Sequence, residues 1–151
     1  MVWRGRALTL GLLAAAALAA GGCDERLSDV TGPTPNLQPT FSSIQRDVFA
    51  ATDSAGRPAC TNCHTNQGRN PAGGLNLLGD AAYAQLVNVP SRGRPDVLRV
   101  KPGDPDGSYL VHKVEGRSDI VGARMPLRGP YLTAGQILVL RRWIALGAPN
   151  N

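Results

Sequence analysis

The chain has 151 residues, of which 16 are basic and 11 acidic, so its formal net charge is +5, and aromatic residues make up only 5%. This length suffices for one small domain with a short extension. The basic residues are scattered rather than gathered into a run, and no aromatic platform accompanies them, which excludes nucleic acid as a partner.

The first 22 residues have the features of an export signal. Arg4 and Arg6 form a positive start, and the apolar stretch of 14 residues that follows is too short and too rich in alanine to span a membrane. Small residues then lead into Cys23 and resemble a bacterial lipobox, although Ala20 stands where leucine is usual. We expect residues 1–22 to be a lipoprotein signal peptide and Cys23 to carry the lipid. Ordinary cleavage near Ala20, leaving a free thiol, is the alternative.

Removal of the signal would leave 129 residues with a net charge near +3. Residues 23–40 are rich in proline, threonine and aspartate and have no sustained hydrophobic period, which predicts a flexible tether. Residues 41–151 are then expected to form the folded domain.

Apolar residues at helical spacing predict the first and last helices of this domain. Residues 41–51 carry one stripe, made of Phe41, Ile44, Val48 and Phe49. Residues 134–146 form the last helix, with Thr133 and Gln136 as a capping box and Gly147 as the C-cap. Its stripe is made of Ile137, Leu140 and Ile144, widened by Leu138 and Trp143.

Two shorter helices are predicted between them. Residues 80–87 form one, with Asp80 as N-cap, and an extended piece at 97–101 follows. Asp104 and Pro105 are then expected to start a third helix, which ends at Gly116.

Cys60, Cys63 and His64 are the fixed positions of a C-x-x-C-H motif, the attachment signature of a c-type haem. Each thiol can form a thioether with one vinyl group of the porphyrin, and the adjacent imidazole can bind the iron as the proximal ligand. A zinc half-site, a redox C-x-x-C pair or a disulfide would use the same residues. No second cysteine pair is present for zinc, and no βαβ pattern surrounds the motif, so haem is favoured. Export agrees with this interpretation, because bacteria attach haem covalently outside the cytoplasmic membrane.

The polar loop after the motif, residues 65–74, contains three glycines that allow it to pass close to a porphyrin edge. A backbone carbonyl near Pro71 is a candidate acceptor for the Nδ1–H of His64, which would fix the imidazole tautomer. An ordinary turn at Pro71 is the alternative. Trp143 is expected in the core, or beside a haem propionate.

Met125 would be the only methionine after removal of the signal, and it lies in a loop bounded by Gly122 and Pro126. A thioether sulfur is a suitable sixth ligand for a low-spin haem iron and raises its reduction potential. We therefore predict that Met125 is the second axial ligand, with a core-filling role as the alternative. His112 is the competing ligand, but its place in a helix favours a structural or surface role.

The motifs together resemble the small planctomycete-type cytochrome c domains, which are relatives of class I cytochrome c. Besides C-x-x-C-H, the similarity rests on Pro102-Gly103-Asp104-Pro105, on Arg124-Met125-Pro126, and on Trp143-Ile144 followed by Gly147-Ala148-Pro149. It covers residues 41–149. The resemblance implies an all-α, class I-like cytochrome c fold with about four helices and long loops. It also implies one haem c on Cys60 and Cys63, with His64 and Met125 as axial ligands.

The sequence therefore predicts a monohaem c-type cytochrome that carries single electrons and is not an enzyme. The lipid on Cys23 would hold it on a membrane of the bacterial cell envelope, facing the periplasm or the exterior, where it meets redox partner proteins. A haem sensor or peroxidase-like domain with an open or labile sixth position is the alternative. A surface module without haem, closed by a Cys60–Cys63 disulfide, is a third possibility.

Overall fold

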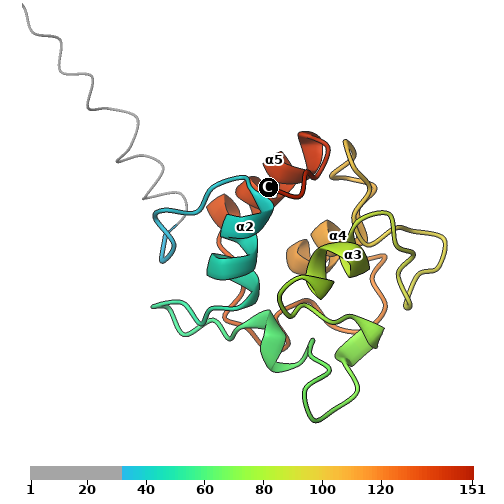
Figure 1. The fold of residues 1–151 in the computed structure, drawn as a ribbon, viewed down its shortest axis with the longest axis horizontal. Helices are drawn as coiled ribbons and strands as arrows, with labels where there is room; N and C mark the ends of the chain where they lie inside the picture. The colour runs from blue at the N-terminus through green and yellow to red at the C-terminus, as the bar shows by residue number, and fades with distance from the viewer. Residues whose placement is uncertain (1–31) are drawn as a thin grey trace, which may run out of the picture.

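The computed structural model describes residues 32–151, which contain four α-helices and no β-strand beyond two isolated bridges (Figure 1). This architecture agrees with the predicted all-α class. The predicted signal peptide and Cys23 lie outside the described residues. Among residues 32–151, no helix combines the length and the apolar character needed to cross a membrane.

The first helix consists of α2, Phe41–Ile44, which continues as a π-helical turn over Gln45–Phe49. Thr40 caps it, since its side chain accepts a hydrogen bond from the Ser43 amide at 3.3 Å. All four residues of the predicted stripe are buried: Phe41, Ile44, Val48 and Phe49. The helix ends two residues before the predicted end, because the Ala50 amide bonds the Gln45 carbonyl in the wider π pattern.

The last helix, α5, spans Ala134–Ala145 and has the predicted capping box of Thr133 and Gln136. Its end is a Schellman motif: the amides of Gly147 and Ala148 bond the carbonyls of Ile144 and Trp143, and Gly147 has a φ of 94°. The predicted stripe needs one correction. Leu138 is 59% exposed, while Val139 is buried. The buried residues recur at i, i+3, i+4, i+7 and i+8 from Gln136, and Leu138 falls outside that face.

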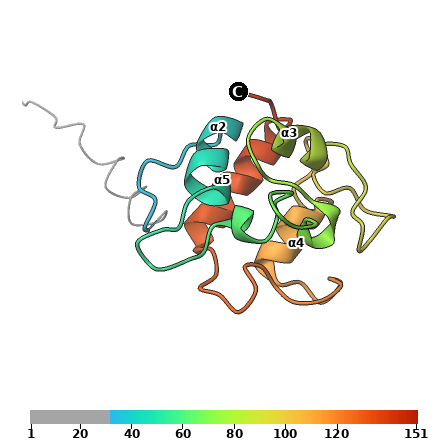
Figure 2. The ribbon, with the colours of Figure 1, turned by 60° about the horizontal axis from the view of Figure 1, so that its bottom comes forward.

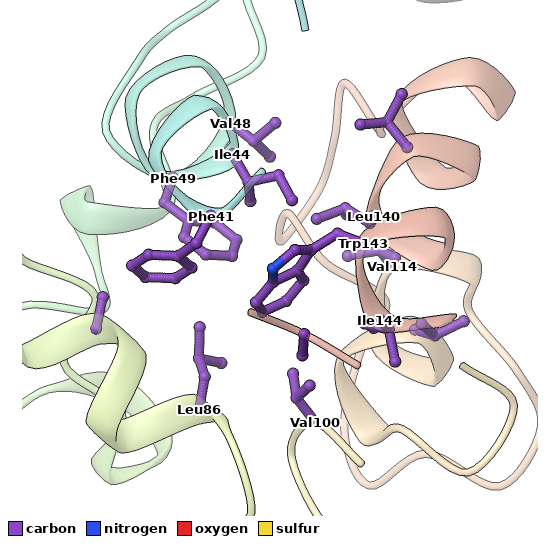
Figure 3. Packing of buried hydrophobic residues seen from close by; sticks show 14 of the residues in the cluster. Phe41, Ile44, Val48, Phe49, Leu86, Val100, Val114, Leu140, Trp143 and Ile144 are labelled. Carbon is purple, nitrogen blue, oxygen red and sulfur yellow. The ribbon is translucent and has the colours of Figure 1, made fainter. Parts of the chain in front are cut away.

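Helices α2 and α5 pack against each other through their apolar faces (Figures 1 and 2). The ring centroids of Phe41 and Trp143 lie 5.7 Å apart, and Figure 3 shows Ile44 of α2 and Val48 of the π-helical turn on the side that faces α5. Trp143 is fully buried, and its indole N–H donates to the Pro149 carbonyl at 2.9 Å. The core role predicted for Trp143 is therefore the one observed.

Helix α3 spans Ala81–Leu86, and the chain after it runs extended, with isolated bridges from Val87 to Val100 and from Pro90 to Leu98. Asp80 occupies the N-cap position, but its side chain forms no capping hydrogen bond, which corrects the prediction. The reason is the backbone of Asp80, with φ −64° and ψ −22°: it is already helical, whereas a capping side chain needs an extended residue.

Helix α4, Tyr109–Glu115, begins later than predicted, with Ser108 as its N-cap. Residues 105–108 form a turn instead, closed by a hydrogen bond from the Ser108 amide to the Pro105 carbonyl at 3.3 Å, and Asp104 Oδ1 accepts from the Gly107 amide at 2.8 Å. Asp, Pro and Gly are common in turns as well as near helix starts, and here the turn prevails. The predicted end is correct, since Gly116 ends α4 with a φ of 74°.

The folded part of the chain begins before residue 41. Leu37 is 2% exposed and belongs to the hydrophobic core, and Gln136 Nε2 donates to Thr34 Oγ1 at 3.0 Å. The end of the predicted tether, from Thr34 onward, is therefore part of the domain. An isolated leucine in a proline-rich segment gives no periodic signal, which is why the sequence placed the boundary too late.

Candidate haem site

Cys60, Cys63 and His64 lie in a single tight turn. Cys60–Asn62 is a 3₁₀ turn, and the Cys60 carbonyl accepts hydrogen bonds from the amides of Cys63 (3.2 Å) and His64 (2.9 Å). Cys60 packs against the hydrophobic core, whereas Cys63 is exposed, and both are free thiols. The two sulfurs and the imidazole thus belong to a stretch of five consecutive residues, 60–64, as attachment to one porphyrin requires.

His64 is held by the loop that follows it. Its Nδ1 lies 2.9 Å from the Ala72 carbonyl, one residue beyond the position predicted from sequence. A carbonyl only accepts, so Nδ1 carries the proton and Nε2 is the nitrogen with the lone pair. The loop is closed onto the motif by two backbone bonds, from Ala72 to Cys63 at 3.1 Å and from Leu77 to His64 at 2.9 Å.

The surroundings of His64 favour the neutral imidazole. Burial lowers its pKa below the ordinary value, and the positive charges of Lys113 and Arg99 lower it further, against the raising effect of the Ala72 and Leu75 carbonyls. A histidine must be neutral at the coordinating nitrogen to bind a metal. Tautomer and charge therefore both suit an iron ligand.

Cys60 lacks the electrostatic signature of a redox-active thiol. Burial raises its pKa to about 11, the neighbouring Cys63 adds to the shift, and the charge of Arg57 opposes it. Catalytic and redox C-x-x-C cysteines have lowered pKa values, because the thiolate is the reactive form. The environment of Cys60 thus favours a protonated thiol, which does not suit the redox alternative for this motif.

Arg57, which the sequence analysis did not single out, fixes the approach to the motif. Its side chain is 0% exposed, and that of its ion-pair partner Asp53, whose Oδ2 lies 3.0 Å from Arg57 Nε, is 2% exposed. The remaining guanidinium donors bond backbone carbonyls at 2.9–3.3 Å, those of Asp47, Val48, Ala51 and Pro58. The Val48 carbonyl also accepts the Cys60 thiol at 3.6 Å, so Arg57 joins the end of the first helix to the motif.

Asp53 extends this anchor to α5. Gln136 Nε2 donates to Asp53 Oδ2 at 3.4 Å, and the Arg57 amide donates to Oδ1 at 3.0 Å. Burial alone raises the pKa of Asp53, but these hydrogen bonds and the Arg57 charge outweigh it, so the pKa lies below the ordinary value. The ionised carboxylate therefore adds stability above the ordinary pKa of aspartate, and this stability is lost as the pH falls through the lowered one.

Substitution of Arg57 by methionine should lower the free energy of unfolding by about 3–5 kcal/mol, because it leaves the Asp53 charge buried without a partner. Denaturant unfolding of the full chain measures this loss. Arg46→Met is the matched control, since Arg46 pairs with Asp47 through a side chain that is 67% exposed, and its midpoint should not move. Equal midpoints for the two variants would mean that Arg57 is not an anchor.

Met125 is fixed to α4. Its amide donates to the Lys113 carbonyl at 2.9 Å, and the Lys113 ammonium donates to the Val121 and Ala123 carbonyls of the same loop. Figure 2 shows this loop, in orange, running below α4 toward the start of α5. Lys113 also acts electrostatically on His64, so one residue of α4 connects the Met125 loop with the surroundings of the imidazole. This connection was not predicted from sequence.

A second contact fixes the loop one residue before Met125. Arg124 Nε donates to the Val114 carbonyl at 2.8 Å, and its guanidinium carbon lies 4.1 Å from the ring centroid of Tyr131. Gly116 makes room for it, because a Cβ there would lie 2.7 Å from Arg124 Cδ. Arg124 and Met125, the two residues directly before Pro126, are thereby held against α4.

His112 has the structural role favoured by its helical position. It is 7% exposed, its Nδ1 lies 2.9 Å from Asp119 Oδ2, and its Nε2 lies 2.6 Å from the Asp106 carbonyl. Both ring nitrogens are therefore engaged by acceptors, and neither is presented to an iron.

The zinc alternative gains no support from the described part of the chain, where no three His, Cys, Asp or Glu side chains form a group able to hold a metal ion. A surface hollow lies between residues 33–37 and 51–54, and its lining includes none of the predicted haem residues. That the C-x-x-C-H turn and Met125 bind one haem stays a prediction.

No family model, no curated protein and no solved structure matches the chain.

Proposed function

We propose that the chain is a monohaem c-type cytochrome that carries single electrons. The observation that carries this proposal is the turn from Cys60 to His64, with His64 Nδ1 held 2.9 Å from the Ala72 carbonyl. A haem bound there would supply an iron that alternates between the ferrous and ferric states.

Four residues of the chain would hold the haem during this change of oxidation state. Cys60 and Cys63 would hold the porphyrin covalently, and the Ala72 carbonyl would keep the His64 imidazole in the tautomer that binds through Nε2. Met125 would supply the second axial ligand. The anchoring of its loop by Lys113 and Arg124 would limit ligand movement between the two oxidation states.

The cellular setting belongs to the same proposal. A lipid on Cys23 would retain the domain at a membrane of the bacterial cell envelope. Its partners would be redox proteins of that compartment. No paired carboxylates or nucleophile–base pair was recognised in the sequence, and we propose an electron carrier rather than an enzyme.

The intact mass of the purified protein tests the proposal, with expression in a host that attaches haem to C-x-x-C-H motifs. We expect a coloured protein that begins at Cys23 and has the mass of the polypeptide, one haem and the lipid. The haem should remain on the chain in a denaturing gel, because thioether bonds survive boiling. Expression in the same host without haem attachment is the control. A colourless protein with the bare polypeptide mass from the competent host would contradict the proposal.

A further inference from the structure

Two cations near His64 lack an acidic partner. Arg99 bonds the turn whose Ala72 carbonyl holds His64, and Lys113 bonds the loop of Met125, yet neither cation takes part in any ion pair formed within residues 32–151. Arg94, Arg117 and Arg141 each bond one or more carboxylates at 2.6–3.4 Å. Five further arginines of residues 32–151 form no ion pair, as Arg99 does not: Arg69, Arg92, Arg124, Arg128 and Arg142. Arg99 differs from them in its hydrogen bond to the turn that holds His64. The surroundings of His64 therefore carry positive charge that the protein itself does not neutralise.

Arg99 is the more confined of the two side chains. Its Nη1 donates to the Gln85 carbonyl at 2.7 Å, and its Nη2 donates to the Gly74 carbonyl at 3.1 Å. These bonds use two of the five guanidinium donors, and both acceptors are neutral. Burial lowers the pKa of Arg99, with no anion acting in the opposite direction. A charge partly removed from water without a counter-charge is unfavourable, so this position suits an anionic group from outside the polypeptide.

The position of Arg99 relates it to the proposed haem. Gly74 ends the short turn Ala72–Gly74, whose first residue supplies the carbonyl that holds His64 Nδ1. The guanidinium thus bonds the same turn that orients the proximal imidazole. Arg92 lies over this turn as well, since a Cβ on Gly74 would be 3.4 Å from Arg92 Cδ.

We infer that the free donors of Arg99 bind a propionate carboxylate of the haem. The inference rests on the proposed function. It identifies the propionate as the anion that neutralises the charge of Arg99. A haem carries two carboxylates, and a planar guanidinium matches the geometry of a carboxylate better than an ammonium does. Lys113, which uses its ammonium to hold the Met125 loop, and Arg92 are the neighbouring charges that would add to the field.

The midpoint reduction potential of the haem-loaded Arg99→Gln variant, measured from pH 5 to pH 9, tests the inference. A cation beside the haem disfavours the ferric state, so its loss should lower the potential where the propionate is ionised. The unpaired propionate should also titrate at a higher pH than in the wild type, because the charge that stabilises the carboxylate is gone. The gap between variant and wild type should therefore narrow as the pH falls. Arg142→Gln, which removes the same charge from an exposed position on α5, should follow the wild type.

Three results decide the inference. If the midpoint potential of Arg99→Gln changes with pH in parallel with that of the wild type and Arg142→Gln, the inference is overturned. The proposed function stays intact in that case, since the haem is present. If Arg99→Gln takes up no haem, Arg99→Lys decides, because it restores the charge: loading and a potential near the wild type support the inference, and failure to load assigns Arg99 a structural role. A wild type without haem in its intact mass would overturn this inference and the proposed function together.

Discussion

A chain in which Cys60 and Cys63 are both replaced by alanine is expected to lose all covalently bound haem. Each thioether needs a cysteine sulfur, and Cys23, the one other cysteine, lies far from this motif in the sequence and is assigned to the lipid. Staining of denaturing gels for haem should fall from the wild-type level to background, and the mass should lack the haem. The folded yield should fall too, because the proposed haem is a large apolar group whose binding would stabilise a small domain with few aromatic residues.

Single and neighbouring substitutions give this experiment its controls. Cys60→Ala and Cys63→Ala each leave one thiol and should each retain one thioether and a stained band. Asn62→Ala alters an exposed side chain between the two cysteines and should stain as the wild type does. A stained band of wild-type intensity from the double variant would mean that the haem is attached elsewhere, and the assignment of the motif would be wrong.

Features of the fold that rest on local signals were predicted well from the sequence. The buried stripe of the first helix and the capping box at Thr133 are encoded by residues within one or two turns of each other. The predicted start of α4 was wrong because Asp and Pro favour both a helix N-terminus and a turn, and residues 105–108 form a turn. Leu37 was missed because its burial depends on what the rest of the chain brings against it.

In the candidate site, too, the features that depend on local sequence were predicted and those that depend on distant segments were not. The motif and a carbonyl acceptor for His64 follow from sequence spacing, and the acceptor is Ala72, next to the predicted Pro71. The roles of Arg57, Arg99 and Lys113 could not be predicted from sequence spacing. Each of these side chains binds backbone carbonyls that other segments of the chain bring to it. A basic residue with this role looks in the sequence like any solvent-exposed charge.

Replacement of Met125 by leucine is expected to keep the covalent haem and to change the iron. Leucine has nearly the volume of methionine, and such swaps usually cost less than about 1.5 kcal/mol, so the loop held by Lys113 and Arg124 should stay folded. The thioether sulfur is lost, however. The ferric protein should therefore lose the long-wavelength absorption band expected for methionine–iron ligation, bind added imidazole or cyanide more readily, and show a lower midpoint potential, because a methionine ligand raises it.

The leucine variant separates ligation from packing, because a methionine that only fills space would be replaced without spectral change. Leu127→Ala, two residues along the same loop at a side chain that is 57% exposed, is the control for disturbance of the loop and should keep the wild-type spectrum. If Met125→Leu also keeps that spectrum and the wild-type potential, Met125 is not the axial ligand. A wild type that is already high-spin and binds added ligands freely would favour the sensor or peroxidase-like alternative. The two results together thus distinguish a closed electron carrier from a haem with an open sixth position.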